Sequence, residues 1–114
     1  MLPPDLQRLQ HMEEYCQAIQ KTMERYGQSF DIFDADPDYQ RSVTFCILQI
    51  GELSVGLSQQ FKDETAQDMQ WAAVRGMRNL VAHSYGTMDR RIIWETACQD
   101  IPALLAFCRQ WLSR

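Results

Sequence analysis

The sequence predicts an all-α protein of about five helices packed as an antiparallel bundle. Apolar residues recur every three or four positions through most of the chain, and no stretch alternates apolar and polar residues with a period of two. The chain also has no internal repeat and no low-complexity segment. Its 114 residues suit a single domain spanning residues 1–114, which is large enough to bury a core without disulfide bonds.

The first expected helix runs from Asp5 to Tyr26. Its apolar side chains form one stripe, and Gly27 is a natural C-terminal stop. His11 lies off that stripe, so we expect it to be solvated. The segment 28–36 is expected to be a loop. It carries three apolar residues that need covering by the core or by a second subunit: Phe30, Ile32 and Phe33.

The second expected helix is long and extends from about Pro37 to Phe61, with Asp36 as its N-cap. Apolar residues cover more than one of its faces, so it should be the central helix that contacts several neighbours. Gly51 and Gly56 support this position. Glycine inside a helix costs about 1 kcal/mol relative to alanine, and a close approach of another helix can offset that cost.

Shorter helices are expected in the second half of the chain. A polar loop leads to a helix that begins near Trp71, with Asp68 as its N-cap. Asp89 is the expected cap of a further helix over residues 90–99. The last helix is expected over residues 100–112, where a proline near the start suits a first helical turn.

Composition narrows the class of protein. The hydrophobic content of 46% and charged content of 23% are ordinary for a soluble globular protein. No apolar run is long enough to cross a bilayer, and the N-terminus lacks the regions of a signal peptide, so we expect a cytoplasmic protein without membrane contact. Cysteines at positions 16, 46, 98 and 108 show no C-x-x-C spacing and are expected to be buried free thiols.

Charge is unevenly distributed along the chain, whose formal net charge is -4. Residues 1–70 contain five Lys or Arg against twelve Asp or Glu, whereas residues 71–91 contain four arginines against Asp89 alone. The four are Arg75, Arg78, Arg90 and Arg91. A small basic site on an acidic body suits one phosphate or a short single strand better than a long duplex. An arginine of this segment is the expected partner of Glu52, a carboxylate on the mostly apolar second helix.

Segment 71–89 concentrates the groups best able to do chemistry. On a helix, Asn79 and His83 would share one face with Arg78 beside them, and Tyr85 follows closely. A purely structural interpretation is a core helix with a surface arginine and a histidine near its C-terminus. Five residues at three- and four-residue spacing would form its apolar face: Trp71, Val74, Met77, Leu80 and Val81.

The spacing within this segment resembles a known motif. Three residues match, position for position, the Arg, four residues, His, one residue, Tyr pattern of the HepT-like HEPN family: Arg78, His83 and Tyr85. Asn79 matches the asparagine that commonly follows this arginine. The resemblance covers residues 37 to 105 approximately. One difference is Gly86, where family members commonly carry a bulky aromatic residue.

The resemblance implies a ribonuclease toxin of a prokaryotic toxin–antitoxin pair. Such proteins are small helical homodimers with a composite active site between the protomers. The resemblance also implies a partner, a nucleotidyltransferase antitoxin of the MNT type, which transfers AMP to the motif tyrosine. Tyr85 is therefore the expected AMP acceptor.

These side chains suit metal-independent cleavage of RNA without a cofactor. A base takes the 2′-OH proton, an acid protonates the leaving 5′-oxygen, and cations stabilise the charge on phosphorus. His83 can act as acid or base, Arg78 can bind the phosphate, and Asn79 can orient His83 or donate to the phosphate. Glu52 and Arg75 are expected to support them. No metal-ligand spacing and no glycine-rich phosphate loop are present.

A single motif histidine supplies only one of the two proton-transfer groups that the reaction needs. A two-fold dimer would bring two copies of the motif into one cleft. The alternative is a non-catalytic helical module that binds RNA, a nucleotide or a nucleotidyltransferase partner. An intact Arg, His and Tyr favours catalysis, because docking alone needs no acid–base group. A plain dimerisation domain would leave the basic segment unexplained.

Overall fold

The computed structural model describes residues 2–82 and 89–114, and it gives no side-chain placement for residues 81 and 82. Within these ranges the chain is helical and has no strand, which confirms the predicted all-α fold class. The elements are α1 (Pro3–Tyr26), α2 (Phe30–Ala35), α3 (Pro37–Val55), α4 (Gln59–Glu64), α5 (Trp71–Ala82), α6 (Arg90–Glu95), the π-helical turn η1 (Thr96–Asp100) and α7 (Ile101–Leu112).

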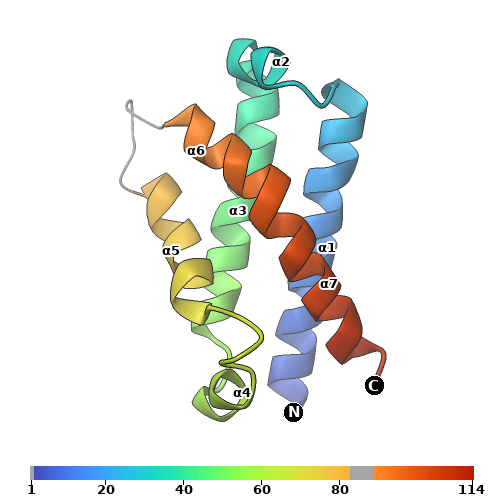
Figure 1. Ribbon diagram of the computed structural model, residues 1–114, viewed down its shortest axis with the longest axis vertical. Coiled ribbons are helices and arrows are strands. Elements are labelled where there is room, and N and C mark those ends of the chain that lie inside the picture. Colours follow the sequence, from blue (N-terminus) through green and yellow to red (C-terminus); the bar gives the residue numbers. More distant parts are fainter. Residues whose placement is uncertain (1, 83–88) are drawn as a thin grey trace.

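The central helix is α3. It contacts α1, α5, α2 and α6, as the apolar residues on more than one of its faces predicted. Figure 1 shows α1 and α5 on opposite sides of α3, with α7 crossing the bundle obliquely. Asp36 caps α3 through its carboxylate, which accepts hydrogen bonds from the backbone N–H groups of Asp38 and Tyr39. The cap predicted from the Asp-Pro pair is therefore confirmed.

The central helix is shorter than predicted. It ends at Val55, and the chain begins a new helix, α4, only a few residues later. Ser58 explains the break: its Oγ accepts a hydrogen bond from Phe61 N–H and so caps α4. The buried carboxylate of Asp5 holds Ser58 in turn, accepting from its backbone N–H at 2.7 Å and from its hydroxyl at 2.6 Å. The α4 helix thus occupies part of the predicted polar loop.

The predicted loop at residues 28–36 contains the short helix α2. Its three apolar residues have different environments. Phe33 is fully buried, Phe30 packs edge-on against Trp94 with ring centroids 6.4 Å apart, and Ile32 is 43% exposed. Trp94 also packs on Phe33 and Tyr39, so an aromatic cluster joins α2, α3 and α6. The core of the same chain therefore covers Phe33 fully and Phe30 partly, and leaves Ile32 exposed.

The predicted break between the last two helices is a π-helical turn. Ile101 N–H donates to the carbonyl of Thr96, five residues earlier, and the chain continues directly into α7. Asp89 caps α6 as predicted. Asp68 does not cap α5, because the N–H groups of Ala73 and Val74 donate to the carbonyl of Gln70 and the helix begins at Trp71.

The cysteine prediction is correct for three of the four thiols. Cys16, Cys46 and Cys108 are buried and free, and burial raises the pKa of each thiol. Cys98 is exposed, contrary to the prediction, because it lies in the π-helical turn on the outer side of the bundle. His11 is exposed as predicted, with Nδ1 3.3 Å from Glu14 Oε2. None of the described helices is both long and apolar enough to cross a membrane.

Candidate active site

The helix that carries the motif, α5, packs against the central helix α3. Trp71, Val74 and Met77 form its buried face, as the spacing predicted. Trp71 is also fixed by a hydrogen bond from its indole Nε1 to Thr65 Oγ1, at 2.8 Å. The first turns of α5 are therefore anchored in the core, and they hold the exposed positions of the helix at defined places on the surface.

Arg78 lies where α5 meets α3. The backbone of Arg78 passes so close to Gly51 that a Cβ atom at Gly51 would lie 2.7 Å from the Arg78 nitrogen. The Arg78 guanidinium pairs with the neighbouring residue Glu52, with 3.3 Å between Nε and Oε1. The prediction that an arginine of the basic segment partners Glu52 is confirmed. The carboxylate is not buried, however, because its side chain is 52% exposed.

Arg75 and Asn79 lie four residues apart on α5, so they share one face of the helix. Both are exposed, and neither side chain makes a hydrogen bond or an ion pair within the described part of the chain. Arg78 follows Arg75 by three residues and lies at the edge of the same surface, between it and α3. The structure therefore brings together Arg75, Arg78, Asn79 and Glu52.

The other two arginines of the basic segment have partners on α2. Arg90 Nε donates a hydrogen bond to Asp34 Oδ1, and the Arg91 guanidinium lies 4.0 Å from the centre of the Phe30 ring. This ion pair and this cation–π contact link α6 to α2. Counting charges along the sequence could not separate these two arginines from Arg75 and Arg78, because Asp34 and Phe30 are more than fifty positions earlier in the chain.

Two predicted site residues, His83 and Tyr85, lie outside the described residues. The predicted shared face of Asn79 and His83 therefore stays a prediction. The described part of the motif helix ends at Ala82, the residue before His83 in the sequence.

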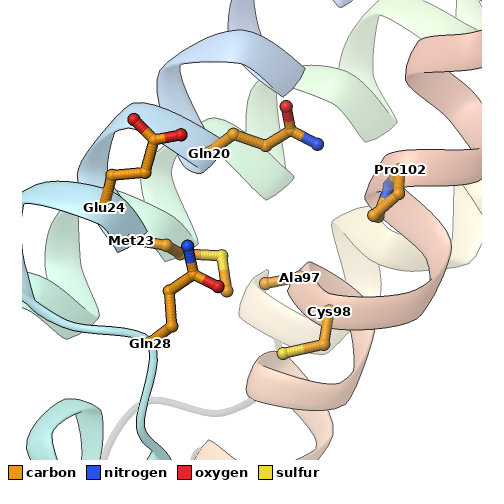
Figure 2. Close-up of a pocket in the computed structure, with 7 residues that line it drawn as sticks. All are labelled: Gln20, Met23, Glu24, Gln28, Ala97, Cys98 and Pro102. Carbon is orange, nitrogen blue, oxygen red and sulfur yellow. The ribbon is translucent and has the colours of Figure 1, made fainter.

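The chain has a cavity of about 340 Å³ that is separate from this group. Figure 2 shows that it lies between the C-terminal part of α1 and the turn formed by η1 and the start of α7. Its polar lining residues include Gln20, Glu24 and Cys98, and none of the described residues that line it is basic. The arginines of the candidate site are on other elements, so this cavity has no phosphate-binding groups to contribute.

No group of His, Cys, Asp and Glu suited to holding a metal ion occurs among the residues that the structure describes. The candidate site instead offers guanidinium and amide donors, with Glu52 as its carboxylate. Such donors bind oxyanions, and a guanidinium can make two parallel hydrogen bonds to one phosphate. The sequence predicted a close approach of another helix at Gly51, and the structure confirms it. The sequence did not identify Arg78 as the residue that lies there.

Comparison with known proteins gives a consistent result. A family model described as "Ribonuclease HepT-like" matches residues 12–111. A protein of Caldanaerobacter subterraneus subsp. tengcongensis, whose name proposes an RNase, is 31% identical over 84% of this chain and 83% of its own length. A protein of Thermococcus cleftensis, whose name proposes a ribonuclease HepT, is 29% identical over 82% of this chain and 86% of its own. No solved structure matches the chain.

Proposed function

Because this chain belongs to the HepT-like ribonuclease family, we propose that it is a metal-independent endoribonuclease and the toxin of a HEPN/MNT toxin–antitoxin pair. The observation that carries the proposal is the half-exposed guanidinium of Arg78, held between α3 and the exposed face of Arg75 and Asn79. The names of both relatives propose the same kind of enzyme. The chain then acts as one domain over residues 1–114.

In the proposed reaction the 2′-oxygen of a ribose attacks the adjacent phosphorus. A base removes the 2′-OH proton, the bond from phosphorus to the 5′-oxygen breaks, and an acid protonates that oxygen. The products are a 2′,3′-cyclic phosphate and a 5′-OH end. Arg78 stabilises the charge that builds on the phosphate, Asn79 donates to the phosphate or orients the histidine, and His83 transfers the protons.

Homodimerisation would complete the site, since one chain supplies one motif histidine. An exposed apolar strip on α3 supports this part of the proposal. Phe45 is 53% exposed and Val55 is 44% exposed, seven residues before and three residues after Glu52, so all three lie on one side of the helix. A second copy covering this strip would approach the ion pair of Glu52 with Arg78. Phe45→Asp should then convert a dimer into a monomer in sedimentation.

The cleavage experiment uses purified protein and a labelled single-stranded RNA. His83→Ala and Arg78→Ala should each lower the rate by roughly two to three orders of magnitude and leave the circular dichroism unchanged. Cleavage by the wild type should persist in EDTA. Unchanged cleavage in either variant, or a requirement for magnesium, would contradict the proposed chemistry.

The proposed antitoxin mechanism is AMP transfer to Tyr85 by a partner nucleotidyltransferase. Phosphate charge and bulk on this residue would compete with RNA for Arg78. Intact-mass spectra after co-expression should show added AMP on the wild type and none on Tyr85→Phe. An inhibited protein without added mass would leave occlusion by the partner as the mechanism.

The alternative function is a non-catalytic module that binds RNA, a nucleotide or a nucleotidyltransferase. The side chain of Arg75 is exposed and has no partner among the described residues, which suits docking as well as catalysis. RNA binding without cleavage by the wild-type dimer would favour this alternative.

A further inference from the structure

The helices α3 and α5 approach each other closely at Gly51. A Cβ atom at this position would lie 2.7 Å from the nitrogen of Arg78, 2.8 Å from its Cβ and 3.0 Å from its Cα. Ordinary contacts of a Cβ atom are 3.4 to 4 Å. The opposing atoms belong to backbone and Cβ, which cannot move without the helix. Any residue larger than glycine at position 51 would therefore push α5 away from α3.

The other glycines within or at the ends of the helices do not make such a contact. A Cβ atom at Gly76, on α5 itself, would have nothing within 4 Å. At Gly56, the C-cap of α3, it would meet the guanidinium of Arg8, which is the far end of a flexible side chain. Gly51 alone among these three sets the spacing of two helices, and it does so at the arginine of the motif.

The ion pair with Glu52 is too weak to fix Arg78 by itself. Its side chains are 41% and 52% exposed, and ion pairs at such exposure stabilise by about 0–1 kcal/mol. An arginine side chain also has several rotatable bonds, so its guanidinium is well placed only if its backbone is fixed first. Gly51 fixes that backbone, and Glu52 then lies within reach of Nε.

We propose that Gly51 is a positioning residue for Arg78: by removing the Cβ atom between α3 and α5, it sets where the Arg78 backbone lies and hence where the guanidinium meets the scissile phosphate. The inference rests on the proposed function, in which Arg78 binds that phosphate. Gly51 acts through Arg78 and need not touch RNA itself.

The kinetic test compares three glycine-to-alanine variants. Gly51→Ala must shift α5 by roughly 1 Å, and a misplacement of this size can lower a rate by about 10²-fold. We expect kcat to fall by about that factor while KM changes by less than about threefold, because the phosphate still reaches a displaced arginine. Gly76→Ala and Gly56→Ala make the same chemical change without a backbone contact. Both should keep kcat within about twofold of the wild type.

A spectroscopic test measures the arginine side chains directly. In the wild type, hydrogen exchange at Arg78 Nε–H should be slower than at Arg75 Nε–H, which has no partner in the described chain. In Gly51→Ala the two rates should become similar, whereas in Gly76→Ala the difference should remain. A role of Gly51 in stability alone would not change the exchange at one arginine side chain.

A folded Gly51→Ala that keeps kcat within about threefold of the wild type would overturn the inference. If that variant does not fold, NMR of the wild-type protein tests the inference instead. An NOE between Gly51 Hα and the Arg78 amide proton, together with slow exchange of Arg78 Nε–H, supports the inference. The absence of either observation overturns it. The proposed function fails separately, if Arg78→Ala still cleaves RNA. The exchange rates would then still report whether Gly51 holds Arg78.

Discussion

The four arginines of residues 71–91 form two pairs with different surroundings. Arg90 and Arg91, at the start of α6, are held by Asp34 and by the ring of Phe30 on α2. Arg75 and Arg78, on α5, are exposed or half-exposed, and within the described residues only Arg78 has a partner. The first pair fastens two helices together. The second pair presents its charge to solvent on the same helix as Asn79.

The difference shows that one run of basic residues can serve both the fold and the site. Around α6 the arginines lie next to an aromatic cluster that is largely buried, so their contacts add to packing. Around α5 the close contact lies at the backbone of Arg78, beside Gly51, and the guanidinium of Arg78 stays half-exposed in its pair with Glu52. Substitutions in the two pairs should therefore have separable effects on catalysis and on stability.

The largest expected difference is between Arg78→Ala and Arg90→Ala. Removing the guanidinium that stabilises the transition state should lower kcat by about 10²- to 10³-fold. Arg90→Ala loses an exposed ion pair, so its kcat should stay within about threefold of the wild type. Initial rates on a single-stranded RNA check both. If kcat fell equally in the two variants, the two pairs of arginines would not differ in their role in catalysis.

A second prediction concerns the α2–α6 end and pH. Burial raises the pKa of Tyr39 to about 12, from an ordinary value near 10, and its hydroxyl donates a hydrogen bond to the Gly27 carbonyl. The raised pKa means that the stabilisation is complete below pH 10 and is lost as pH rises to about 12. The loss should amount to roughly 2 to 3 kcal/mol, at 1.36 kcal/mol for each pKa unit.

Urea unfolding at a series of pH values, with the wild type and Tyr39→Phe side by side, measures this loss. The variant lacks the titrating hydroxyl, so its unfolding free energy should fall less steeply between pH 10 and 12. Burial also raises the pKa of the buried thiols, but it does so in both proteins, so their contributions cancel in the difference. Parallel curves would mean that Tyr39 contributes nothing to the pH dependence.

Arg75 should contribute to RNA binding through its charge alone. Arg75→Ala removes one phosphate contact, so the slope of log affinity against log salt should become shallower by about 0.7 for a single strand. Arg41→Ala is the matched control, because Arg41 is also exposed but is already paired with Asp38. RNA affinities measured at several salt concentrations give both slopes. An unchanged slope for Arg75→Ala would place the RNA away from this face of α5.

The smallest expected effect is that of Asp34→Asn on stability. The pair with Arg90 is 40–45% exposed, so its loss should lower the unfolding free energy by less than about 1 kcal/mol. Chemical denaturation measures this change, and RNA cleavage should not differ from the wild type. A loss of cleavage in Asp34→Asn would mean that the α2–α6 end also shapes the site.

The sequence was informative where a local rule decides the structure. The helical period, the Asp36 and Asp89 caps and the stop at Gly27 all follow from neighbouring residues, and all are confirmed. The sequence was misleading where a residue far away in the chain determines the local structure. The central helix ends early because Asp5 holds the cap residue Ser58, fifty-three positions away.

The same rule separates the predicted from the unpredicted parts of the site. Arg75, Arg78 and Asn79 could be grouped from their helical spacing, and the partner of Glu52 from the need of a carboxylate on an apolar helix. The contacts of Arg90 and Arg91 with Asp34 and Phe30 depend on how α2 packs against α6. No periodicity in the sequence encodes that contact.

The π-helical turn η1 accommodates one extra residue between α6 and α7. A turn closed between Thr96 and Ile101 holds one residue more than an α-helical turn. Because the turn is wider, it takes up that residue locally, and α6 continues directly through it into α7. Deleting one residue from this turn should therefore restore an α-helical turn with little change in the orientation of α6. Trp94 would stay in the aromatic cluster, and Arg90 and Arg91 would keep their contacts with α2. The turn thus lets the chain carry an extra residue without moving the helix that follows the motif.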